Sequence, residues 1–276
     1  MIRDKFSAIW VSHSSISDYL KCPRAYYLNN VYRDPKTNHK IALMQPALAL
    51  GQAIHEVIER IAVLPVEERL NHPLKSVFED ILQKISGKRG GCRTQEEENK
   101  YLDRGRAMID RIQNHPGPIL RYAVRLRQDL LYYWFSEPDN IILCGKIDWL
   151  EYKPETDCVA IIDFKTGRFD VDEDSLQLSI YYLLAKNCQK RNVSGVSYWY
   201  LERDDEPHDL TLPDESRAIE RVGEVAKRIS LARKLERFVC KNKEGCANCR
   251  PLERILQGEA TPVGINDYNQ DVYALL

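Results

Sequence analysis

The sequence predicts an α/β protein in which helices flank a small mixed central sheet. Three apolar runs rich in β-branched and aromatic residues follow one another at 130–136, 141–150 and 158–164, and a fourth lies at 195–201. Segments with apolar residues at helical spacing precede and follow these runs. A chain of 276 residues with 43% hydrophobic content can bury one large core, so we expect a single domain over residues 1–276. The class becomes α+β if the sheet is mainly antiparallel.

The first half of the chain is expected to be helical. Ser14 and Ser15 offer hydroxyl oxygens that can cap the first helix, and Asp18 completes a variant of the capping box. A glycine-rich loop at 87–93 separates two of the later helices. Helices are expected over residues 12–32, 46–63, 73–86 and 97–113. The segment 64–128 is therefore interpreted as a helical insertion ahead of the sheet.

The apolar runs within 130–164 predict a three-stranded meander, because turn-forming segments at 137–140 and 153–157 separate them. A helix is expected over 173–188, before the fourth strand. A basic helix over 215–238 then leads into a cluster of cysteines.

The charge balance excludes two classes of protein. The chain has 40 Lys and Arg against 41 Asp and Glu, a net charge of −1, which fits neither a histone-like basic protein nor a disordered acidic one. Contact with nucleic acid must therefore use a local basic patch. No apolar run approaches the roughly 18 residues of a membrane span, and the first residues lack the apolar core of a secretory signal. We expect a cytoplasmic protein that does not contact a membrane.

Two aspartates interrupt neighbouring apolar strands. If residues 152–157 form the turn, Asp148 and Asp163 face each other across the hairpin, and Lys165 shares a face with Asp163. Opposed carboxylates destabilise a sheet unless a hard divalent cation lies between them. The alternative is a pair of ordinary strand-end acids matched to Lys146 and Lys165, and a slip of one residue in the register would turn one acid away.

Three of the eight cysteines lie within ten residues of one another near the carboxyl end. Cys240, Cys246 and Cys249 have the spacing C-x5-C-x2-C, in a loop whose thiols can converge on a metal. A disulfide framework is not expected in a chain without a secretory signal. Four thiolates would suit either a [4Fe–4S] cluster or a structural Zn²⁺ ion, so a fourth ligand is needed.

These motifs, taken in order, resemble the PD-(D/E)XK nuclease superfamily in its RecB-type branch. The amino-terminal segment, a helix with a cysteine followed by proline, also resembles that branch. The matching residues are Ser14 to Tyr27 with Cys22-Pro23, Gly51-x3-His55, Asp148, Asp163-x-Lys165 and Gln177-x3-Tyr181. Within the branch, the size and the cysteines are most similar to CRISPR-adaptation exonucleases and to the nuclease modules of AddAB-type DNA repair enzymes.

The resemblance implies a restriction-endonuclease-like core and a set of catalytic-site residues. It makes His55, Asp148 and Asp163 ligands of Mg²⁺ or Mn²⁺, with the carbonyl of Phe164 as a further oxygen ligand. Such an ion lowers the pKa of its bound water and stabilises charge on the phosphate. Lys165 would act electrostatically on the water or the phosphate.

The same resemblance assigns the remaining motif residues. Gln177 and Tyr181, four residues apart on one helix face, would position the lysine and the substrate. Cys22 becomes the fourth cysteine ligand, because the family pattern places one cysteine at the amino end and three at the carboxyl end. Cys22 and the segment 240–249 would then hold an iron–sulfur cluster that joins the two ends of the chain. Irregular spacing disfavours a zinc ribbon, which favours the [4Fe–4S] cluster.

DNA is expected along the basic helix. Residues 217–250 contain ten Lys and Arg against four Glu, a net charge of +6, which can bind phosphates without reading bases. The side chains proposed to contact DNA are Arg228, Arg233, Lys234 and Arg237. A second arginine-rich stretch contains Arg104, Arg106, Arg111, Arg121, Arg125 and Arg127.

The sequence thus predicts a metal-dependent DNA nuclease, a hydrolase that acts as an exonuclease on single-stranded ends. A helicase, CRISPR-adaptation or repair partner is expected, because the chain contains no P-loop with which to drive unwinding. Two alternatives stay open. One is an iron–sulfur DNA-binding or scaffold subunit with weak or no nuclease activity, and the other is a zinc-stapled RNA-processing enzyme.

Overall fold

The computed structural model describes residues 5–124 and 130–276. Arg125 and Arg127 of the second arginine-rich stretch therefore lie outside the described residues. The helices are α1 (His13–Lys21), α2 (Pro23–Tyr26), α3 (Pro46–Ala62), α4 (Leu74–Lys84), α5 (Gln95–Asn114), α6 (Gln177–Cys188), α7 (Glu215–Lys234) and α8 (Arg250–Leu256), with a π-helical turn at Tyr27–Val31 and 3₁₀ turns at Val66–Glu68 and Gly117–Leu120. The strands are β1 (Ile9–Val11), β2 (Lys40–Met44), β3 (Leu131–Ser136), β4 (Ile141–Gly145), β5 (Trp149–Lys153), β6 (Cys158–Lys165), β7 (Asn192–Tyr200), β8 (His208–Leu210), β9 (Thr261–Ile265) and β10 (Gln270–Ala274).

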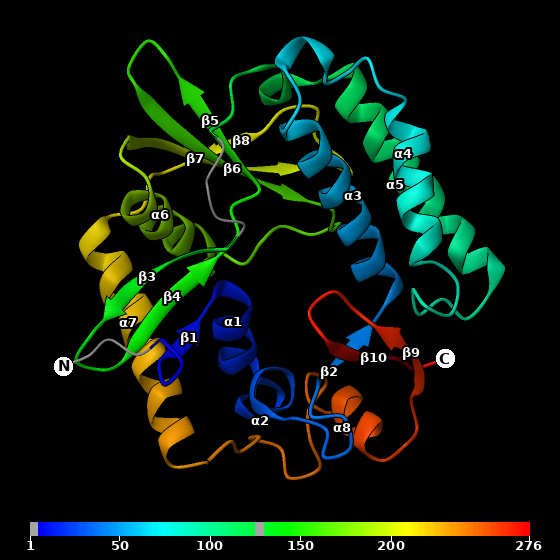
Figure 1. Cartoon of the computed structure of the whole chain (residues 1–276), viewed down its shortest axis with the longest axis vertical. Coiled ribbons are helices and arrows are strands. Elements are labelled where there is room, and N and C mark those ends of the chain that lie inside the picture. The colour runs from blue at the N-terminus through cyan, green and yellow to red at the C-terminus, as the bar shows by residue number, and fades with distance from the viewer. Residues whose placement is uncertain (1–4, 125–129) are drawn as a thin grey trace.

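A four-stranded mixed sheet in the order β5-β6-β7-β8 is the centre of the fold (Figure 1). Its β6–β7 pair is parallel, whereas β5–β6 and β7–β8 are antiparallel. The predicted α/β class is confirmed. The remaining strands form two further sheets, β1-β4-β3 and β2-β10-β9, instead of joining the first.

The predicted three-stranded meander is wrong, because the run at 141–150 is two strands. The chain leaves β4 at Gly145, where an added Cβ would lie 2.9 Å from Leu184, and enters β5 at Trp149. β4 pairs with β3 and β1, while β5 pairs with β6 in the other sheet. The predicted register of the β5–β6 hairpin is nevertheless confirmed, since Trp149 pairs with Ile162 and places Asp148 one residue before the ladder.

The amino-terminal helix is also shorter than predicted. Residues 12–32 form three pieces, because Cys22 has an extended backbone and Pro23 begins the next helix. The cap differs as well: Ser12 accepts from the backbone of Ser15, and the Ser15 hydroxyl accepts from the backbone of Ser12. Asp18 instead accepts hydrogen bonds from the side-chain amides of Asn29 and Asn30.

Later helix boundaries shift for local reasons. The predicted helix at 46–63 is confirmed as α3, which starts at a proline suited to the first turn. Helix α6 begins four residues later than predicted, after a turn in which Ser175 donates to the carbonyl of Asp172. Helix α7 ends before residue 238 because Glu236 has a left-handed backbone, with φ of 48°.

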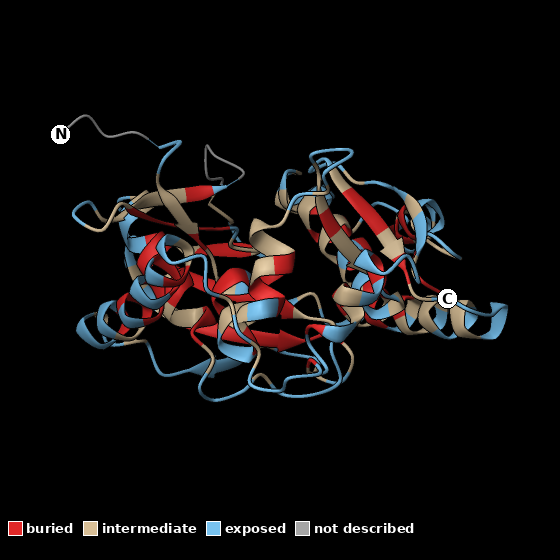
Figure 2. Cartoon of the chain, turned by 90° about the horizontal axis from the view of Figure 1, so that it is seen from below, coloured by how far each residue is buried: buried red, intermediate tan, exposed pale blue. Residues whose placement is uncertain are grey.

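Two buried clusters cover the two faces of the central sheet. On β6, Ile161 packs with α6 and α7, while Ile162 and Phe164 pack with α3, α4 and α5. Figure 2 shows buried residues along the strands and the inner helix faces, with exposed residues outside. Because side chains alternate along a strand, Asp163 and Lys165 belong to the face covered by α6.

The segment proposed as an insertion contributes α4 and α5, which pack against α3. Its status as an insertion, and the single-domain assignment, stay predictions. Among the described helices, none combines the length and hydropathy needed to cross a membrane.

Alanine substitutions at two mid-helix glycines test this packing, because they should change the free energy of unfolding in opposite directions. A Cβ at Gly105 in α5 would lie 1.9 Å from the buried ring of Phe78, whereas a Cβ at Gly223 in α7 would meet Phe135 at 3.4 Å, an ordinary contact. We expect Gly105→Ala to lower the free energy of unfolding by about 1–3 kcal/mol through overpacking. Gly223→Ala should raise it by up to about 1 kcal/mol, because alanine favours a helix. Urea unfolding of both variants measures the difference, and a stabilised Gly105→Ala would contradict the helix packing.

Candidate active site

Three parts of the fold bring the predicted catalytic residues together. Helix α3 supplies a histidine, the β5–β6 hairpin two aspartates and a lysine, and α6 an amide and a phenol. These residues are His55, Asp148, Asp163, Lys165, Gln177 and Tyr181.

Asp163 is the centre of a buried polar network and is only 2% exposed. Gln177, the first residue of α6, donates from Nε2 to Oδ1 of Asp163 at 2.8 Å. The Oε1 atom of the same amide accepts from Nζ of Lys165 at 2.6 Å. Nε2 of Gln177 also lies 3.2 Å from the hydroxyl of Tyr181. One amide therefore fixes both the carboxylate and the ammonium group.

Asp148 and His55 form a second pair beside this network. Nδ1 of His55 lies 3.3 Å from Oδ1 of Asp148. The other oxygen of Asp148 accepts a hydrogen bond from the backbone N–H of Phe164 at 3.1 Å. That bond crosses the hairpin from the residue next to Asp163, so it holds the Asp148 carboxylate at the end of β6.

The electrostatics of the two pairs are linked. Burial and the charge of Asp148 raise the pKa of Asp163 and the ammonium group of Lys165 lowers it, with a net value of about 7. For His55, burial lowers the pKa, but the hydrogen bond and charge of Asp148 outweigh it, so the net direction is upward. Two carboxylates, an ammonium group and an imidazole thus share one site.

The chemical groups of Asp163, Asp148 and His55 are suited to binding a hard divalent cation. Oδ2 of Asp163 is buried and forms an ion pair with Nζ of Lys165, 2.6 Å away, without a hydrogen bond of standard geometry in the described chain. A buried carboxylate near a second carboxylate and an imidazole is a ligand set for Mg²⁺ or Mn²⁺.

The donor atoms of the three predicted metal ligands, His55, Asp148 and Asp163, do not converge on a single point. In the part of the chain that is described, only the four cysteines form a group of three or more potential ligands whose donor atoms lie within 4.8 Å of one another. Asp163 is held toward Lys165, and Asp148 toward His55. The Phe164 carbonyl stays a prediction, since only the N–H of that residue has a contact at the site.

Two further residues adjoin the site. Nζ of Lys165 lies 4.9 Å from the centroid of the buried Tyr198 ring. His13, the first residue of α1, has a pKa lowered to about 4 by burial and by the charges of Lys165 and Lys21. A histidine at a helix start carries no motif, so no signal in the sequence pointed to it.

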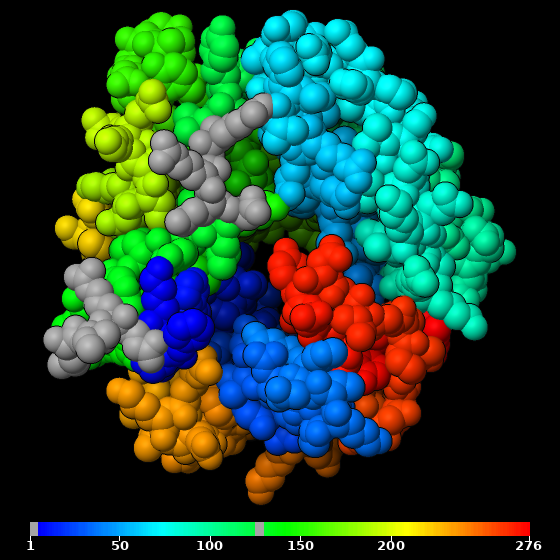
Figure 3. Space-filling model, in the orientation of Figure 1, coloured from blue at the N-terminus to red at the C-terminus, as the bar shows by residue number. Residues whose placement is uncertain are grey.

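Helices that carry site residues surround part of an opening in the molecule. Figure 3 shows a hollow between α3, the segment around α1 and the hairpin of β9 and β10. Two of the bordering helices carry site residues, His55 on α3 and His13 on α1.

The four predicted cysteines meet although more than 200 residues separate Cys22 from the others. All four Sγ atoms lie within 4.8 Å of one another, and those of Cys246 and Cys249 are 3.8 Å apart. Cys22 and Cys249 are buried, and all four are free thiols. The arrangement therefore fits a metal group held by four thiolates.

The protein environment of these thiols also suits ligation. Burial raises the pKa of Cys246, but backbone N–H groups of Cys249 and Asn248 and the neighbouring thiols lower it, to a net value of about 6. Burial raises the pKa of Cys249 to about 12. The protein itself therefore stabilises the thiolate form of Cys246, whereas the buried Cys249 thiol would ionise only when a metal cation binds it.

The predicted DNA-contacting side chains lie along the carboxyl-terminal half of α7 and just beyond it. The guanidinium of Arg228 lies 5.8 Å from the ring centroid of Tyr19 on α1. Lys234 and Arg237 are exposed, and Arg233 is half-buried beside Tyr26. Their contact with DNA stays a prediction.

This mixed sheet, with an aspartate and a lysine beside a second carboxylate and a helix-borne histidine, is the arrangement that the nuclease motifs predicted. A family model described as the PD-(D/E)XK nuclease superfamily matches residues 10–253. The chain belongs to this superfamily.

A solved structure has the same overall fold. The crystal structure of a candidate exonuclease from Eubacterium rectale matches with a TM-score of 0.52 at 14% sequence identity, over 88% of this chain and 87% of that one. At this identity the likeness shows the fold alone. No curated protein matches the sequence.

Proposed function

We propose that the protein is a divalent-metal-dependent deoxyribonuclease that acts as an exonuclease on single-stranded DNA ends. The observation that carries the proposal is the buried Asp163 carboxylate, bound by Gln177 beside Lys165 and close to the Asp148–His55 pair. A buried carboxylate costs several kcal/mol unless it is compensated. A site that places a half-buried second carboxylate and a lysine beside this buried one fits metal-assisted phosphodiester hydrolysis better than a structural role.

Each residue has a separate task in this proposal. Asp148, Asp163 and His55 would hold the ion, with the Phe164 carbonyl as a further ligand; the ion would activate water and stabilise charge on the phosphate. Lys165 would place its positive charge where negative charge develops on the phosphate oxygens. Gln177 would hold the side chains of Lys165 and Asp163 in position, and Tyr181 would orient Gln177. Water would enter through the hollow in Figure 3.

The choice of single-stranded ends rests on two supports. The motif order resembles the RecB-type branch, whose CRISPR-adaptation and AddAB-type members supply the proposed role and the expected partners. In addition, the hollow between α1, α3 and the β9–β10 hairpin offers a way in for one flexible strand. The basic residues near α1, such as Arg228 and Arg233, would attract its phosphates.

Cleavage assays on Asp163 and Lys165 test the proposal. We expect the wild type to degrade single strands labelled at either end with Mn²⁺ or Mg²⁺, and to be inactive in EDTA. Asp163→Ala and Lys165→Ala should each lower the rate by at least about 10²–10³-fold, the usual cost of losing a group that stabilises the transition state. Lys190→Ala, an exposed change on the turn after α6, should leave the rate unchanged.

Retained cleavage in both active-site variants would refute the site. DNA binding without any cleavage by the wild type would instead favour a scaffold subunit. Preference for RNA over DNA would favour an RNA-processing enzyme.

We further propose that Cys22, Cys240, Cys246 and Cys249 hold a [4Fe–4S] cluster. The irregular spacing, with no pair of C-x2-C knuckles, supports a cluster. The 3.8 Å between the sulfurs of Cys246 and Cys249 supports a second candidate, because sulfurs about 2.3 Å from one tetrahedral zinc ion lie about that far apart. A cluster binds each thiolate to a different iron and would spread the sulfurs.

Elemental analysis separates the two candidates. After anaerobic purification we expect about four irons and four sulfides per chain, with absorbance near 400 nm. Cys22→Ser should lose the iron and lower the melting temperature, because the group joins distant parts of the chain, whereas the control Cys158→Ser should keep it. One zinc ion without iron would contradict the cluster, and neither metal would contradict both candidates.

A further inference from the structure

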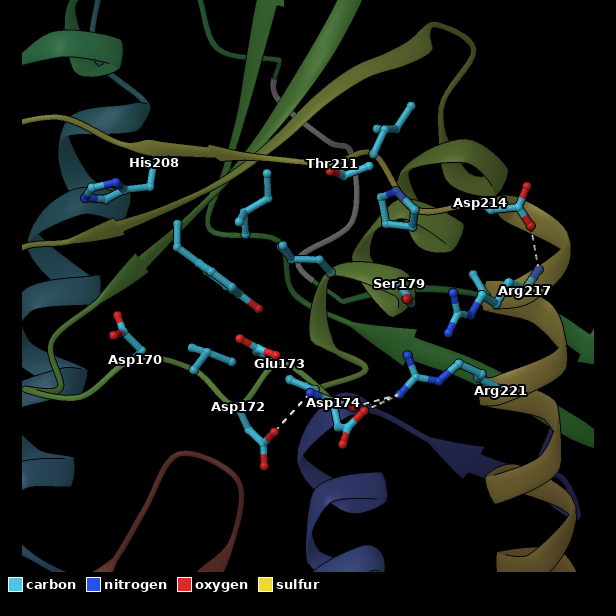
Figure 4. Close-up of a pocket in the computed structure, with 18 of the residues that line it drawn as sticks. Asp170, Asp172, Glu173, Asp174, Ser179, His208, Thr211, Asp214, Arg217 and Arg221 are labelled. Carbon is cyan, nitrogen blue, oxygen red and sulfur yellow. Dashed lines mark hydrogen bonds and ion pairs between the residues drawn. The ribbon is translucent and has the colours of Figure 1, made fainter.

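A groove lies at the β8 edge of the central sheet, on the face that also carries the catalytic network. It is formed by the loop at 170–175, by β8 with the linker that follows it, and by the first turns of α7 (Figure 4). Its volume is about 890 Å³, within the range of pockets that bind small molecules. Neither the nuclease motifs nor the proposed metal site uses it.

The groove continues the sheet face that carries the catalytic residues. Asp163 pairs with Tyr198, and Lys165 with Tyr200, across the parallel β6–β7 ladder. Tyr198 in turn pairs with His208 on β8. Paired residues point to the same face of a sheet, and neighbouring strands are about 4.8 Å apart. The groove at β8 is therefore about 10 Å from β6, with the two tyrosines as its floor.

Two arginines one helical turn apart form one wall. Figure 4 shows Arg217 and Arg221 reaching side by side from α7 into the groove. Arg221 donates to the carbonyl of Asp174 at 3.0 Å and lies 3.7 Å from its carboxylate. Within the described ranges, the guanidinium of Arg217 has no carboxylate partner. The backbone N–H of Arg217 donates to the side chain of Asp214.

The opposite wall is acidic, and the carboxylates of Asp172 and Glu173 have no cationic partner among the described residues. Asp170 is paired with Arg203, and Asp172 accepts a hydrogen bond from the backbone of Asp174 at 2.9 Å. Asp174 is the acid that reaches across to the arginine wall, where it is 96% exposed. An exposed ion pair of this kind contributes little stability, so an incoming anion can replace Asp174 on Arg221.

We propose that this groove binds a backbone phosphate of the DNA strand on one side of the cleaved bond. Arg217 takes the phosphate first, and Arg221 joins when the phosphate displaces Asp174. The proposal deepens the proposed function and rests on it, because it assumes that the scissile phosphate lies at Asp163. A strand held there and running across β7 reaches the arginines within a few nucleotides.

Binding measured without cleavage tests the groove. A fluorescent single-stranded oligonucleotide is titrated in EDTA at several salt concentrations, and anisotropy gives the Kd. We expect Arg217→Gln to weaken binding about fivefold at 0.15 M salt and to reduce the salt slope by about 0.7, the loss of one phosphate contact. Asp174→Asn should tighten binding about threefold, because it frees Arg221.

Lys190→Gln is the matched control. Lys190 is exposed on the turn after α6, outside both the groove and the basic segment 217–250. We expect its Kd and salt slope to equal those of the wild type. Equal behaviour of Arg217→Gln and Lys190→Gln, or weaker binding by Asp174→Asn, would overturn the proposal.

The two proposals fail in different ways. If the wild type cleaves DNA in Mn²⁺ and Arg217→Gln has the wild-type Kd, the phosphate site in the groove is refuted and the proposed nuclease activity stands. No cleavage in Mn²⁺ with an Arg217-dependent Kd would refute the nuclease and keep the groove as a binding site for single-stranded DNA.

Discussion

The burial of Asp163 is the constraint on which the rest of the site depends. A carboxylate that is 2% exposed at the end of a central strand is unfavourable unless nearby groups compensate for lost hydration. The chain supplies Lys165 on the same strand, whose ammonium group pairs with one oxygen of Asp163, and Gln177 at the first position of α6, whose amide donates to the other. The second carboxylate, at Asp148, adds negative charge that a bound cation would offset.

The local part of this site could be predicted from the sequence, and the reason is short-range geometry. The turn expected at 152–157 sets the register of the hairpin, so the pairing next to Asp148 and Asp163 followed from it. The spacing of Gln177 and Tyr181 likewise required only one helix turn. The break after Gly145 was missed, because a run of apolar residues does not show that its two halves belong to different sheets.

Elements that depend on distant partners could not be predicted. β2 pairs with β10 although some 230 residues separate them, and β1 and β8 have three residues each, too few for a period to show. Cys22 was placed with the other cysteines by resemblance alone, since spacing cannot join residues at opposite ends of a chain. His13 reaches the site only because β1 positions the start of α1. Tertiary contacts, not local preference, decide all of these.

The most direct test of the central assignment is Mn²⁺ binding in the absence of DNA. Isothermal titration calorimetry on metal-free protein at a pH above 7, where Asp163 ionises, compares the wild type with Asp163→Asn. We expect the wild type to bind Mn²⁺ and the variant, which keeps the shape of the side chain but not its charge, to lose that binding. Identical isotherms for the two proteins would contradict a metal held by Asp163.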